Sequence, residues 1–311
     1  MNTVPSSKLR RLVNLGCGSR FHPDWVNADI APQNPSVMQC DLSRRLPFPD
    51  NDFDVVYHSN VLEHIRRDDA SAFMRECFRV LKPGGILRVA VPDLERICRL
   101  YLEKLQLATS GDVASAYDRD WMLLEMYDQT VREKSGGAML DFLRQNPLPN
   151  ESFVLERIGQ EGRELIAALR NTPQPQIQIQ SMSQAKVPPS KKRSQLREVI
   201  RRPRTLFEMF GRKSRASPKM DGQKNLNECL GADWRRALDI GRFRLAGEVH
   251  QWMYDRFSLA RLMSSAGFRE PTLRSPVDSA IPGWTKFNLD TLPDGSTIKP
   301  DSFFMEATKS C

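Results

Sequence analysis

Five short apolar-rich runs, most of them ending near a glycine or an acid, constrain the fold of this chain more than any other feature. They occupy residues 11–15, 25–30, 37–42, 53–59 and 86–92. Runs of this length bounded by turn residues are typical of strands, and near-continuous apolar runs suit a parallel sheet covered on both faces. A helical pattern from residue 68, ended by KPGG at 82–85, separates the fourth run from the fifth. This order predicts a doubly wound α/β domain.

The rest of the chain changes character after the fifth run. Residues 94–170 have helical spacing and predict a helical insertion. Residues 250–268 predict a helix with Ser258 as its N-cap and Gly267 at its end. Residues 302–309 predict a final strand, so we expect residues 226–311 to complete the same sheet.

The first run ends in the turn Gly16-Cys17-Gly18, where glycine allows positive φ and close approach to a ligand. In doubly wound folds, nucleotides bind at the carboxyl edge of the first strand. However, Phe21 stands where a GxGxxG motif needs its third glycine, and no Gly-Lys-Ser/Thr follows. The acid Asp29 also comes only 13 residues after Gly16, instead of about 20. The turn is therefore not built to cradle phosphates.

Several motifs follow one another at the ends of the predicted strands: VNLGCGSR, ADI, CDL, LPFPDNDFDVVYHSNVLEHI and FRVLKPGGILRVAVPD. Together they resemble a class I S-adenosylmethionine-dependent methyltransferase, in the small "type 11" group that is similar to cell-surface glycan-associated methyltransferases. The resemblance implies a seven-stranded Rossmann-like sheet, a cofactor-binding core at residues 9–93, and a substrate cap formed by residues 94–170. It also implies S-adenosylmethionine as the cofactor.

The resemblance implies a role for each residue that matches the family's motifs. The implied cofactor contacts are Gly16, Cys17 and Gly18 at the methionine part, Asp29 at the ribose hydroxyls, Ile30 and Leu42 beside the adenine, Asp41 at its amino group, and His58 and Ser59 near the transferable methyl. Carboxylates suit the hydroxyls and the amine because they accept hydrogen bonds. The spans 16–29 and 29–41 are short, so we expect the first two crossover helices to be reduced or irregular.

Candidate catalytic residues follow from the chemistry. Methyl transfer needs alignment, and it needs a base only where the acceptor must lose a proton. His250 is our first candidate for a base or substrate contact; the alternative is a half-buried histidine bonded to backbone. Asp93 is the second candidate, or a cap for the helix that follows it. We interpret Glu63-His64 as structural or cofactor-side packing. Some related methyltransferases hold a metal through Glu-x-x-Glu-His and a further histidine, but Asn60 occupies the first position here, so no metal is predicted.

The net charge of +8 is concentrated in one segment, since residues 186–224 hold 13 Lys or Arg and three acids. The remainder of the chain is therefore close to neutral. We predict a low-complexity basic linker at 171–225 and, within it, a possible amphipathic helix at 196–213. A solvated linker, a helix on an anionic membrane surface and a nucleic-acid site all remain open; the last is disfavoured because no RNA-binding module is present.

Other features concern the compartment. No window approaches 18 consecutive apolar residues, and the start of the chain lacks the apolar stretch of a secretory signal. The six cysteines form no CxxC pair, which fits a reducing cytoplasm.

We therefore expect a cytoplasmic enzyme that methylates an acceptor oxygen, with binding at the inner membrane face through residues 196–213 as an open alternative. The resemblance favours a sugar hydroxyl of a cell-surface glycan or of a lipid-linked precursor. Alternatives are a small-molecule or RNA methyltransferase, or a non-catalytic cofactor-binding scaffold tethered to membrane. Nothing in the sequence indicates the oligomeric state.

Overall fold

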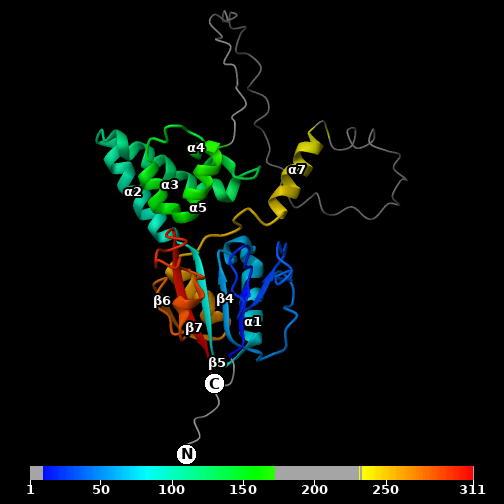
Figure 1. Ribbon diagram of the computed structural model, residues 1–311. Helices are drawn as coiled ribbons and strands as arrows, with labels where there is room; N and C mark the ends of the chain where they lie inside the picture. The colour runs from blue at the N-terminus through cyan, green and yellow to red at the C-terminus, as the bar shows by residue number, and fades with distance from the viewer. Residues whose placement is uncertain (1–9, 172–230, 232, 311) are drawn as a thin grey trace, which may run out of the picture. The chain divides into compact units, whose positions relative to one another are not determined.

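A computed structural model describes residues 10–171, 231 and 233–310 of the chain. The main unit contains the described residues 10–171 and 238–310, and of a second, short unit only residues 231 and 233–237 are described. Seven strands of the main unit form one sheet in the order β3-β2-β1-β4-β5-β7-β6 (Figure 1). Their bounds are β1 Leu12–Leu15, β2 Val26–Asp29, β3 Met38–Gln39, β4 Phe53–Ser59, β5 Leu81–Pro92, β6 Phe268–Arg274 and β7 Ser302–Lys309.

The direction of the strands places the site. Strands β1 to β5 run parallel to one another, whereas β7 runs antiparallel to both β5 and β6. The strand order reverses between β1 and β4, and in such sheets ligands bind outside the carboxyl ends at this switch point. The predicted seven-stranded Rossmann-like fold is confirmed.

The first two crossovers are loops. Neither connection, from β1 to β2 or from β2 to β3, contains a helix, as the short spans in the sequence predict. The first is held instead by tight turns, in which Arg20 N donates to Cys17 O (2.8 Å) and Trp25 N donates to His22 O (3.0 Å). Loops therefore border this side of the site.

One face of the sheet is covered by α1 (Arg67–Val80) and α8 (Arg256–Ser265), which contact each other although they lie far apart in the chain. Their apolar faces enter the main core with Phe73, Met74, Leu259 and Met263. The predicted N-cap Ser258 is wrong by three residues. Asp255 caps α8, because its Oδ1 accepts from Ser258 N (2.7 Å) while Ser258 Oγ accepts from Asp255 N (3.0 Å), a capping box.

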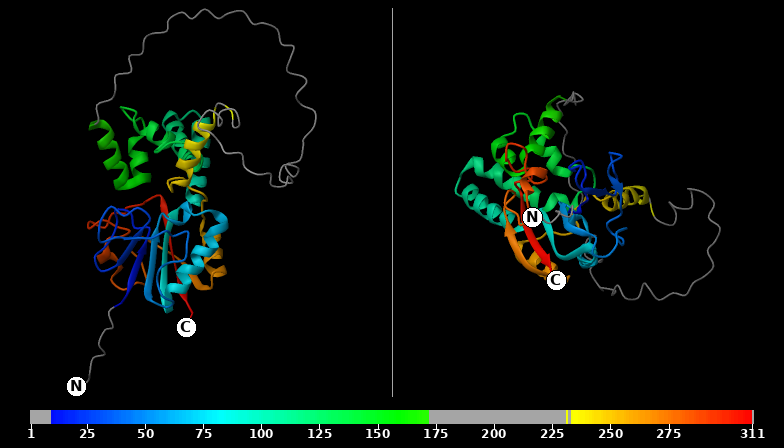
Figure 2. Two further views of the ribbon diagram at one scale, coloured as in Figure 1. Left: turned by 90° about the vertical axis from the view of Figure 1, so that its right-hand side faces the viewer. Right: turned by 60° about the horizontal axis from the view of Figure 1, so that its bottom comes forward.

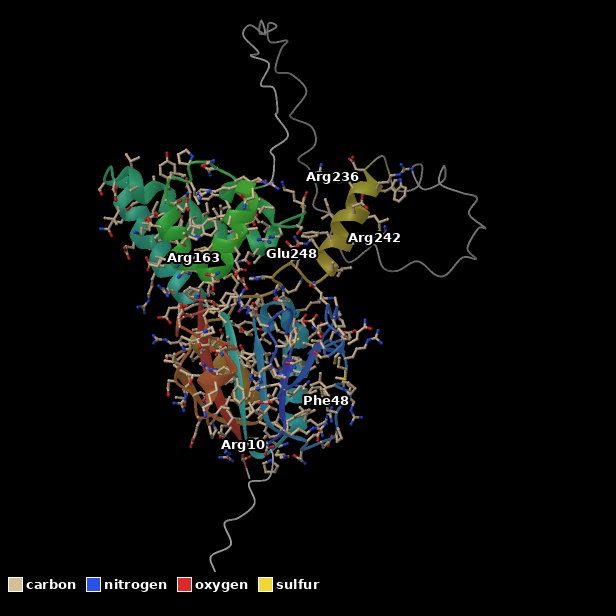
Figure 3. The ribbon with its side chains drawn as sticks, viewed as in Figure 1. Arg10, Phe48, Arg163, Arg236, Arg242 and Glu248 are labelled. Atoms are coloured by element: carbon tan, nitrogen blue, oxygen red, sulfur yellow. The ribbon has the colours of Figure 1, made fainter. Side chains whose placement is uncertain are left out.

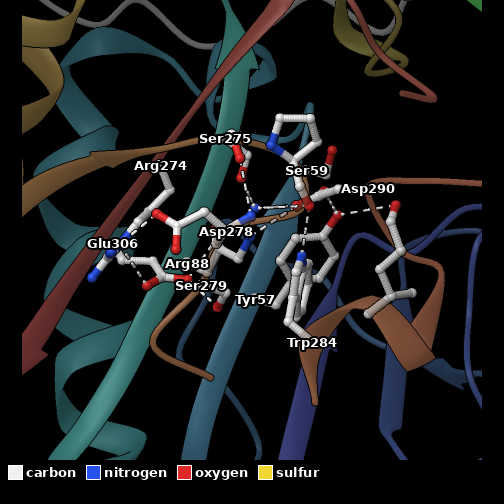
Figure 4. Close-up of polar contacts among 12 residues, drawn as sticks. Tyr57, Ser59, Arg88, Arg274, Ser275, Asp278, Ser279, Trp284, Asp290 and Glu306 are labelled. Carbon is white, nitrogen blue, oxygen red and sulfur yellow. Dashed lines mark hydrogen bonds and ion pairs between the residues drawn. The ribbon is translucent and has the colours of Figure 1, made fainter. Parts of the chain in front are cut away.

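The opposite face of the sheet is covered by an irregular segment that includes a short 3-10 turn, Trp284–Phe287. Arg88 of β5 is fully buried there, and its guanidinium donates to Asp290 Oδ2 (2.8 Å) and Glu306 Oε1 (2.8 Å) (Figure 4). Tyr57 OH donates to the other oxygen of Asp290 (2.6 Å). A buried cation is tolerated only when it is paired in this way, so the network joins the segment to the sheet.

Four helices follow β5, beyond the carboxyl end of the sheet (Figures 1 and 2). They are α2 Leu94–Thr109, α3 Val113–Val131, α4 Gly137–Leu143 and α5 Glu151–Asn171. Together they enclose their own apolar core around Trp121 and Met122. A buried ion pair joins α3 to α5: Arg157 Nη2 lies 2.7 Å from Glu125 Oε2, and Trp121 Nε1 donates to the same carboxylate (2.5 Å). The helical character predicted for residues 94–170 is thus observed.

The remaining helix, α7 (Trp234–Leu245), crosses the boundary between the two units. The predicted basic linker 171–225, apart from its first residue, and the predicted amphipathic helix 196–213 lie outside the described residues. Among the helices that are described, none is both long enough and apolar enough to cross a membrane.

Candidate functional site

The turn after β1 is shaped by two glycines with positive φ, Gly16 (+67°) and Gly18 (+51°). The amides of Gly16 and Cys17 both donate to Ala28 O, at 2.7 and 3.2 Å, and so tie the turn to the end of β2. A Cβ atom on Gly16 would lie 2.4 Å from Val61 Cγ2, whereas one on Gly18 would meet no atom within 4 Å. Packing therefore requires glycine at position 16, while position 18 borders open space.

Asp29 ends β2 beside this turn. Its Oδ2 accepts from Gly18 N (2.8 Å) and its Oδ1 accepts from Ala31 N (2.9 Å), and the next side chain, Ile30, is 60% exposed. A carboxylate offers about four lone-pair positions, so about half of them remain for a ligand. Burial, with the nearby Asp29 charge, raises the pKa of Cys17 to about 11, so the thiol stays protonated.

Asp41 and Leu42 follow β3. Asp41 Oδ1 accepts from Ser43 N (3.0 Å) and Ser43 Oγ (2.6 Å), while its Oδ2 pairs with Arg44 Nε (3.0 Å). These bonds, those of Ser43 first, lower the pKa of Asp41 and keep it charged. Leu42 Cδ1 lies 3.5 Å from the Cβ position of Gly16, so the two strand ends converge. A cavity of about 310 Å³ opens beside Leu42, lined also by Ser43, Ile65 and Phe73.

The two residues that end β4 differ in access. His58 is fully buried, its ring packs edge-on against Phe73 of α1 (5.2 Å between centroids), and neither nitrogen has a partner among the described residues. Burial lowers the pKa of His58 to about 3, so the ring is neutral. Ser59 is half-buried and donates to Asn60 Oδ1 (3.2 Å). Of the pair, Ser59 is the one with an exposed side, and contact of either residue with a cofactor stays a prediction.

Asp93 is engaged at the start of α2. Its Oδ1 accepts from Arg96 N (3.0 Å) and caps the helix, which is the alternative role that the sequence left open. Its backbone amide donates to Asp301 O (2.9 Å), and Leu94 N donates to Tyr254 O (3.1 Å). The side chain is half-buried, so its role as a base remains a prediction.

His250 lies against the residues that follow β4. Glu63 and His64 belong to a short 3-10 turn, Leu62–His64, and the rings of His64 and His250 meet edge to face with centroids 4.8 Å apart. Backbone bonds hold the arrangement, since Gln251 N donates to Glu63 O (2.6 Å) and His250 N donates to Gln129 O (2.9 Å). One ligand atom from each of Glu63, His64 and His250 lies within 4.8 Å of the other two.

This group, which we call the Glu63 cluster (Glu63, His64 and His250), is largely buried, and several of its polar atoms lack a hydrogen-bond partner among the described residues. Burial raises the pKa of Glu63 to about 8, against the weaker opposing influences of its own backbone and of Asn60, and burial lowers the pKa of His250 to about 3. Both Glu63 oxygens and the Nδ1 atoms of the two histidines are buried without a well-formed hydrogen bond to any described residue. Tyr254 OH is also buried without a hydrogen bond to any described residue. Burial raises the pKa of Tyr254 to about 12.

The helical insertion holds a second cavity, of about 300 Å³. Its apolar wall includes Trp121, Met139, Leu143 and Ile158, and its polar wall includes Arg132 and Lys299. The cations are paired: Arg132 contacts Asp128 Oδ2 (2.8 Å) and Glu248 Oε1 (3.0 Å), and Lys299 contacts Glu161 (2.5 Å). Glu248, labelled in Figure 3, also accepts from Gly136 N (2.8 Å).

The sequence indicated His250 but treated Glu63 and His64 as packing. The acid–histidine pair directly after a strand end was the available signal. Its significance depends on His250, which stands 186 positions later and reaches the pair only through the fold.

Comparison with known proteins agrees with the fold. Residues 14–89 match a family model described as a methyltransferase domain. The chain is 48% identical over 101 residues to a probable S-adenosylmethionine-dependent methyltransferase of Mycolicibacterium smegmatis, covering 27% of this chain and 38% of that protein. It is 32% identical over 108 residues to one of Mycobacterium tuberculosis, covering 29% and 38%. The chain thus spans little more than a third of the length of these relatives.

Among solved structures, one chain of a Haloferax volcanii complex, between the Trm112 methyltransferase activator and a methyltransferase, is 11% identical with a TM-score of 0.36, covering 99% of this chain and 86% of that one. An S-adenosylmethionine-dependent methyltransferase from Mesorhizobium loti is 20% identical with a TM-score of 0.22, covering 29% and 50%. The strand order and the family match, rather than these scores, support a class I S-adenosylmethionine-dependent methyltransferase. S-adenosylmethionine is the cofactor of this enzyme class.

Proposed function

We propose that this protein transfers the methyl group of S-adenosylmethionine to an acceptor oxygen. The observation that carries the proposal is the junction of the glycine turn with Asp29, where Gly18 N donates to Asp29 Oδ2 (2.8 Å) at the carboxyl edge of β1 and β2. It combines open space above Gly18 with free carboxylate lone pairs, and it contains no phosphate-binding motif. A nucleoside with a cationic sulfonium fits this combination.

In the proposed complex the glycine turn contacts the methionine part, and Asp29 accepts hydrogen bonds from the ribose hydroxyls. Asp41 accepts from the adenine amino group through Oδ2, at the expense of its exposed pair with Arg44. Ile30 and Leu42 flank the ring, and Ser59 borders the methyl. The 60% exposure of Ile30 supports this placement, because a bound adenine would cover an apolar side chain that otherwise faces water.

The reaction is an in-line displacement. A lone pair on the acceptor oxygen attacks the methyl carbon, the C–O bond forms as the C–S bond breaks, and the C–S electron pair stays on sulfur to give S-adenosylhomocysteine. The hydroxyl proton must leave as well. We propose that His250 takes this proton at Nδ1, which belongs to a neutral ring and has no hydrogen-bond partner among the described residues. Asp93 is the less favoured candidate, since its carboxylate caps α2.

For the acceptor we propose a sugar hydroxyl of a cell-surface glycan or of its lipid-linked precursor. The support is the resemblance of the motifs and the basic, amphipathic pattern of residues 196–213, which suits contact with anionic lipid. The second cavity, apolar on one wall and polar on the other, would admit an amphipathic molecule. The enzyme would then work at the cytoplasmic face of the inner membrane.

The test is transfer of labelled methyl from S-adenosylmethionine by the full-length protein into a fractionated cell lysate. We expect label in the glycan or lipid-linked fraction, and none with Asp29→Ala. Label in RNA or in small molecules would show that the acceptor is not a sugar hydroxyl of a glycan or of its lipid-linked precursor. Cofactor binding without label in any fraction would favour the non-catalytic scaffold.

Membrane contact is tested separately by flotation with anionic vesicles. The full chain should float and a chain lacking residues 196–213 should not. If both proteins float to the same extent, residues 196–213 do not bind membrane and serve only as a linker.

A further inference from the structure

The Glu63 cluster is held together by the backbone. Its first two residues come from the turn after β4, and His250 comes from the segment that precedes α8. Trp252 N and Gln251 N both donate to Glu63 O (3.2 and 2.6 Å), so the approach of the three side chains does not depend on contacts between them.

Four buried polar atoms of the cluster have no hydrogen-bond partner among the residues that the structure describes. The side chain of Glu63 is 1% exposed, and no well-formed hydrogen bond from a described residue reaches either oxygen. The Nδ1 atoms of His64 and His250 are also buried without a well-formed hydrogen bond to any described residue. Buried polar groups in folded proteins are almost always satisfied, and a buried carboxylate without a partner is costly. Four such atoms on three side chains, whose ligand atoms lie within 4.8 Å of one another, indicate a missing ligand that accepts electron pairs.

The neighbouring side chains do not supply it. Asn60 donates from its Nδ2 to Ser302 Oγ (3.4 Å) and accepts at its Oδ1 from Ser59 Oγ (3.2 Å), and its influence on the pKa of Glu63 is weaker than that of burial. In the described part of the chain, no lysine or arginine lies within ion-pair distance of Glu63; Lys299 pairs with Glu161 (2.5 Å). A cation from outside the chain would fill the gap.

We propose that Glu63, His64 and His250 bind a divalent transition-metal ion of the Zn²⁺ type. Two imidazoles and one carboxylate bind catalytic zinc or iron in proteins and leave positions open for a further ligand. Ligand atoms around such an ion lie roughly 3.4 Å apart, as two bonds of about 2.1 Å at a tetrahedral angle require. The ligand atoms of the three side chains, now within 4.8 Å of one another, would approach by up to about 1.4 Å through side-chain rotation.

The role of the ion rests on the proposed function. An open coordination position beside the ends of β4 and β5 would hold the acceptor oxygen and lower the pKa of its hydroxyl. His250 would then act through the ion, and the hydroxyl proton would pass to solvent water before the C–O bond forms. Tyr254 OH, also buried and unpartnered, is a second polar group available to the acceptor.

The test uses the full-length protein, freed of any affinity tag and of metal by a chelator, and titrated with Zn²⁺ in a calorimeter. We expect one equivalent to bind. Glu63→Gln and His250→Asn should each weaken binding by more than about 100-fold, since even outer-shell changes cost 10–100-fold. His22→Asn is the matched control, because His22 packs on Phe287 outside the cluster, and it should bind as the wild type does.

Folding of each variant is checked by its affinity for S-adenosylmethionine, because the residues proposed to bind the cofactor, such as Gly16, Asp29 and Asp41, are not members of the Glu63 cluster. Should a buried position fail to fold, His64→Asn replaces it, because the His64 side chain is 28% exposed. Absence of stoichiometric binding, or equal binding by the wild type and the cluster variants, overturns the inference. The readout needs no acceptor, so methyl transfer by a protein that binds no Zn²⁺ would refute the ion and leave the proposed function standing.

Discussion

The two sides of the candidate site are built in opposite ways. On the cofactor side, the carboxylates of Asp29 and Asp41 already accept bonds from residues close to them in the chain, such as Ala31 and Ser43. On the proposed acceptor side, the Glu63 cluster is assembled across 187 positions, and four of its buried polar atoms have no hydrogen-bond partner among the described residues. The first side is preorganised without a ligand, while the second requires something more to be satisfied.

This difference indicates that binding of the cofactor and binding of the acceptor depend on different kinds of local structure. Hydroxyls and an amine need acceptors with fixed directions, which short loops with local bonds provide. Binding of an acceptor or an ion needs polar side chains that are shielded from water and point toward one another, and the packing of distant segments provides such an arrangement here. Changes on the cofactor side should therefore alter cofactor affinity, and changes on the acceptor side should alter transfer or metal binding.

The largest expected effect is that of Asp29→Ala on cofactor affinity. Hydrogen bonds to a charged group contribute about 1.5–3 kcal/mol each, so losing two should weaken S-adenosylmethionine binding by about 100-fold or more. Titration calorimetry measures the dissociation constant of S-adenosylmethionine for the wild type and for the variant. Asp24→Ala is the control, because this neighbouring carboxylate is 74% exposed. Unchanged affinity in Asp29→Ala would remove Asp29 from the cofactor side.

A second prediction concerns His58, which lies between the two sides. Its pKa of about 3 in the folded protein is below the ordinary 6.5, so the unfolded chain binds more protons between these values and stability falls as the pH falls. Between pH 7 and pH 5 this amounts to about 2 kcal/mol. Urea unfolding at both pH values should show a correspondingly smaller difference for His58→Asn. An identical difference would mean that the ring is not excluded from water.

Third, the two glycines of the turn should respond differently to alanine. Gly16→Ala forces a Cβ against Val61, at 2.4 Å, and should cost about 1–3 kcal/mol of stability. Gly18→Ala meets no atom and should carry only the strain of positive φ, about 1 kcal/mol. Urea unfolding at pH 7 compares them, and equal losses would show that packing against Val61 is not the constraint.

The smallest effect is expected for the cap of α8. Asp255→Ala removes one half of the capping box and should cost about 1 kcal/mol of stability. Cofactor affinity should not change, since Asp255 has no part in the cofactor side. A weakened affinity in this variant would show that the two sides are coupled through the segment 250–255.

The two sides also differ in how much of them could be predicted. Gly16, Asp29 and Asp41 each stand at the end of a short strand, so their positions at one sheet edge followed from the strand pattern alone. The N-cap of α8 was misplaced because both Asp255 and Ser258 can cap a helix, and only their reciprocal bonds distinguish N-cap from N3. The burial of His58 under Phe73 could not be predicted, because the strand pattern does not tell which helix covers which ring.

By itself the sequence determined the class of fold and the local arrangement of the proposed cofactor side, because strand ends, tight turns and nearby carboxylates are set by residues only a few positions apart. The tertiary structure alone decided that His250 meets Glu63 and His64, since that contact depends on a backbone bond between Gln251 and Glu63. It also decided the pKa of Glu63, because burial is a property of all the segments that exclude water from a side chain.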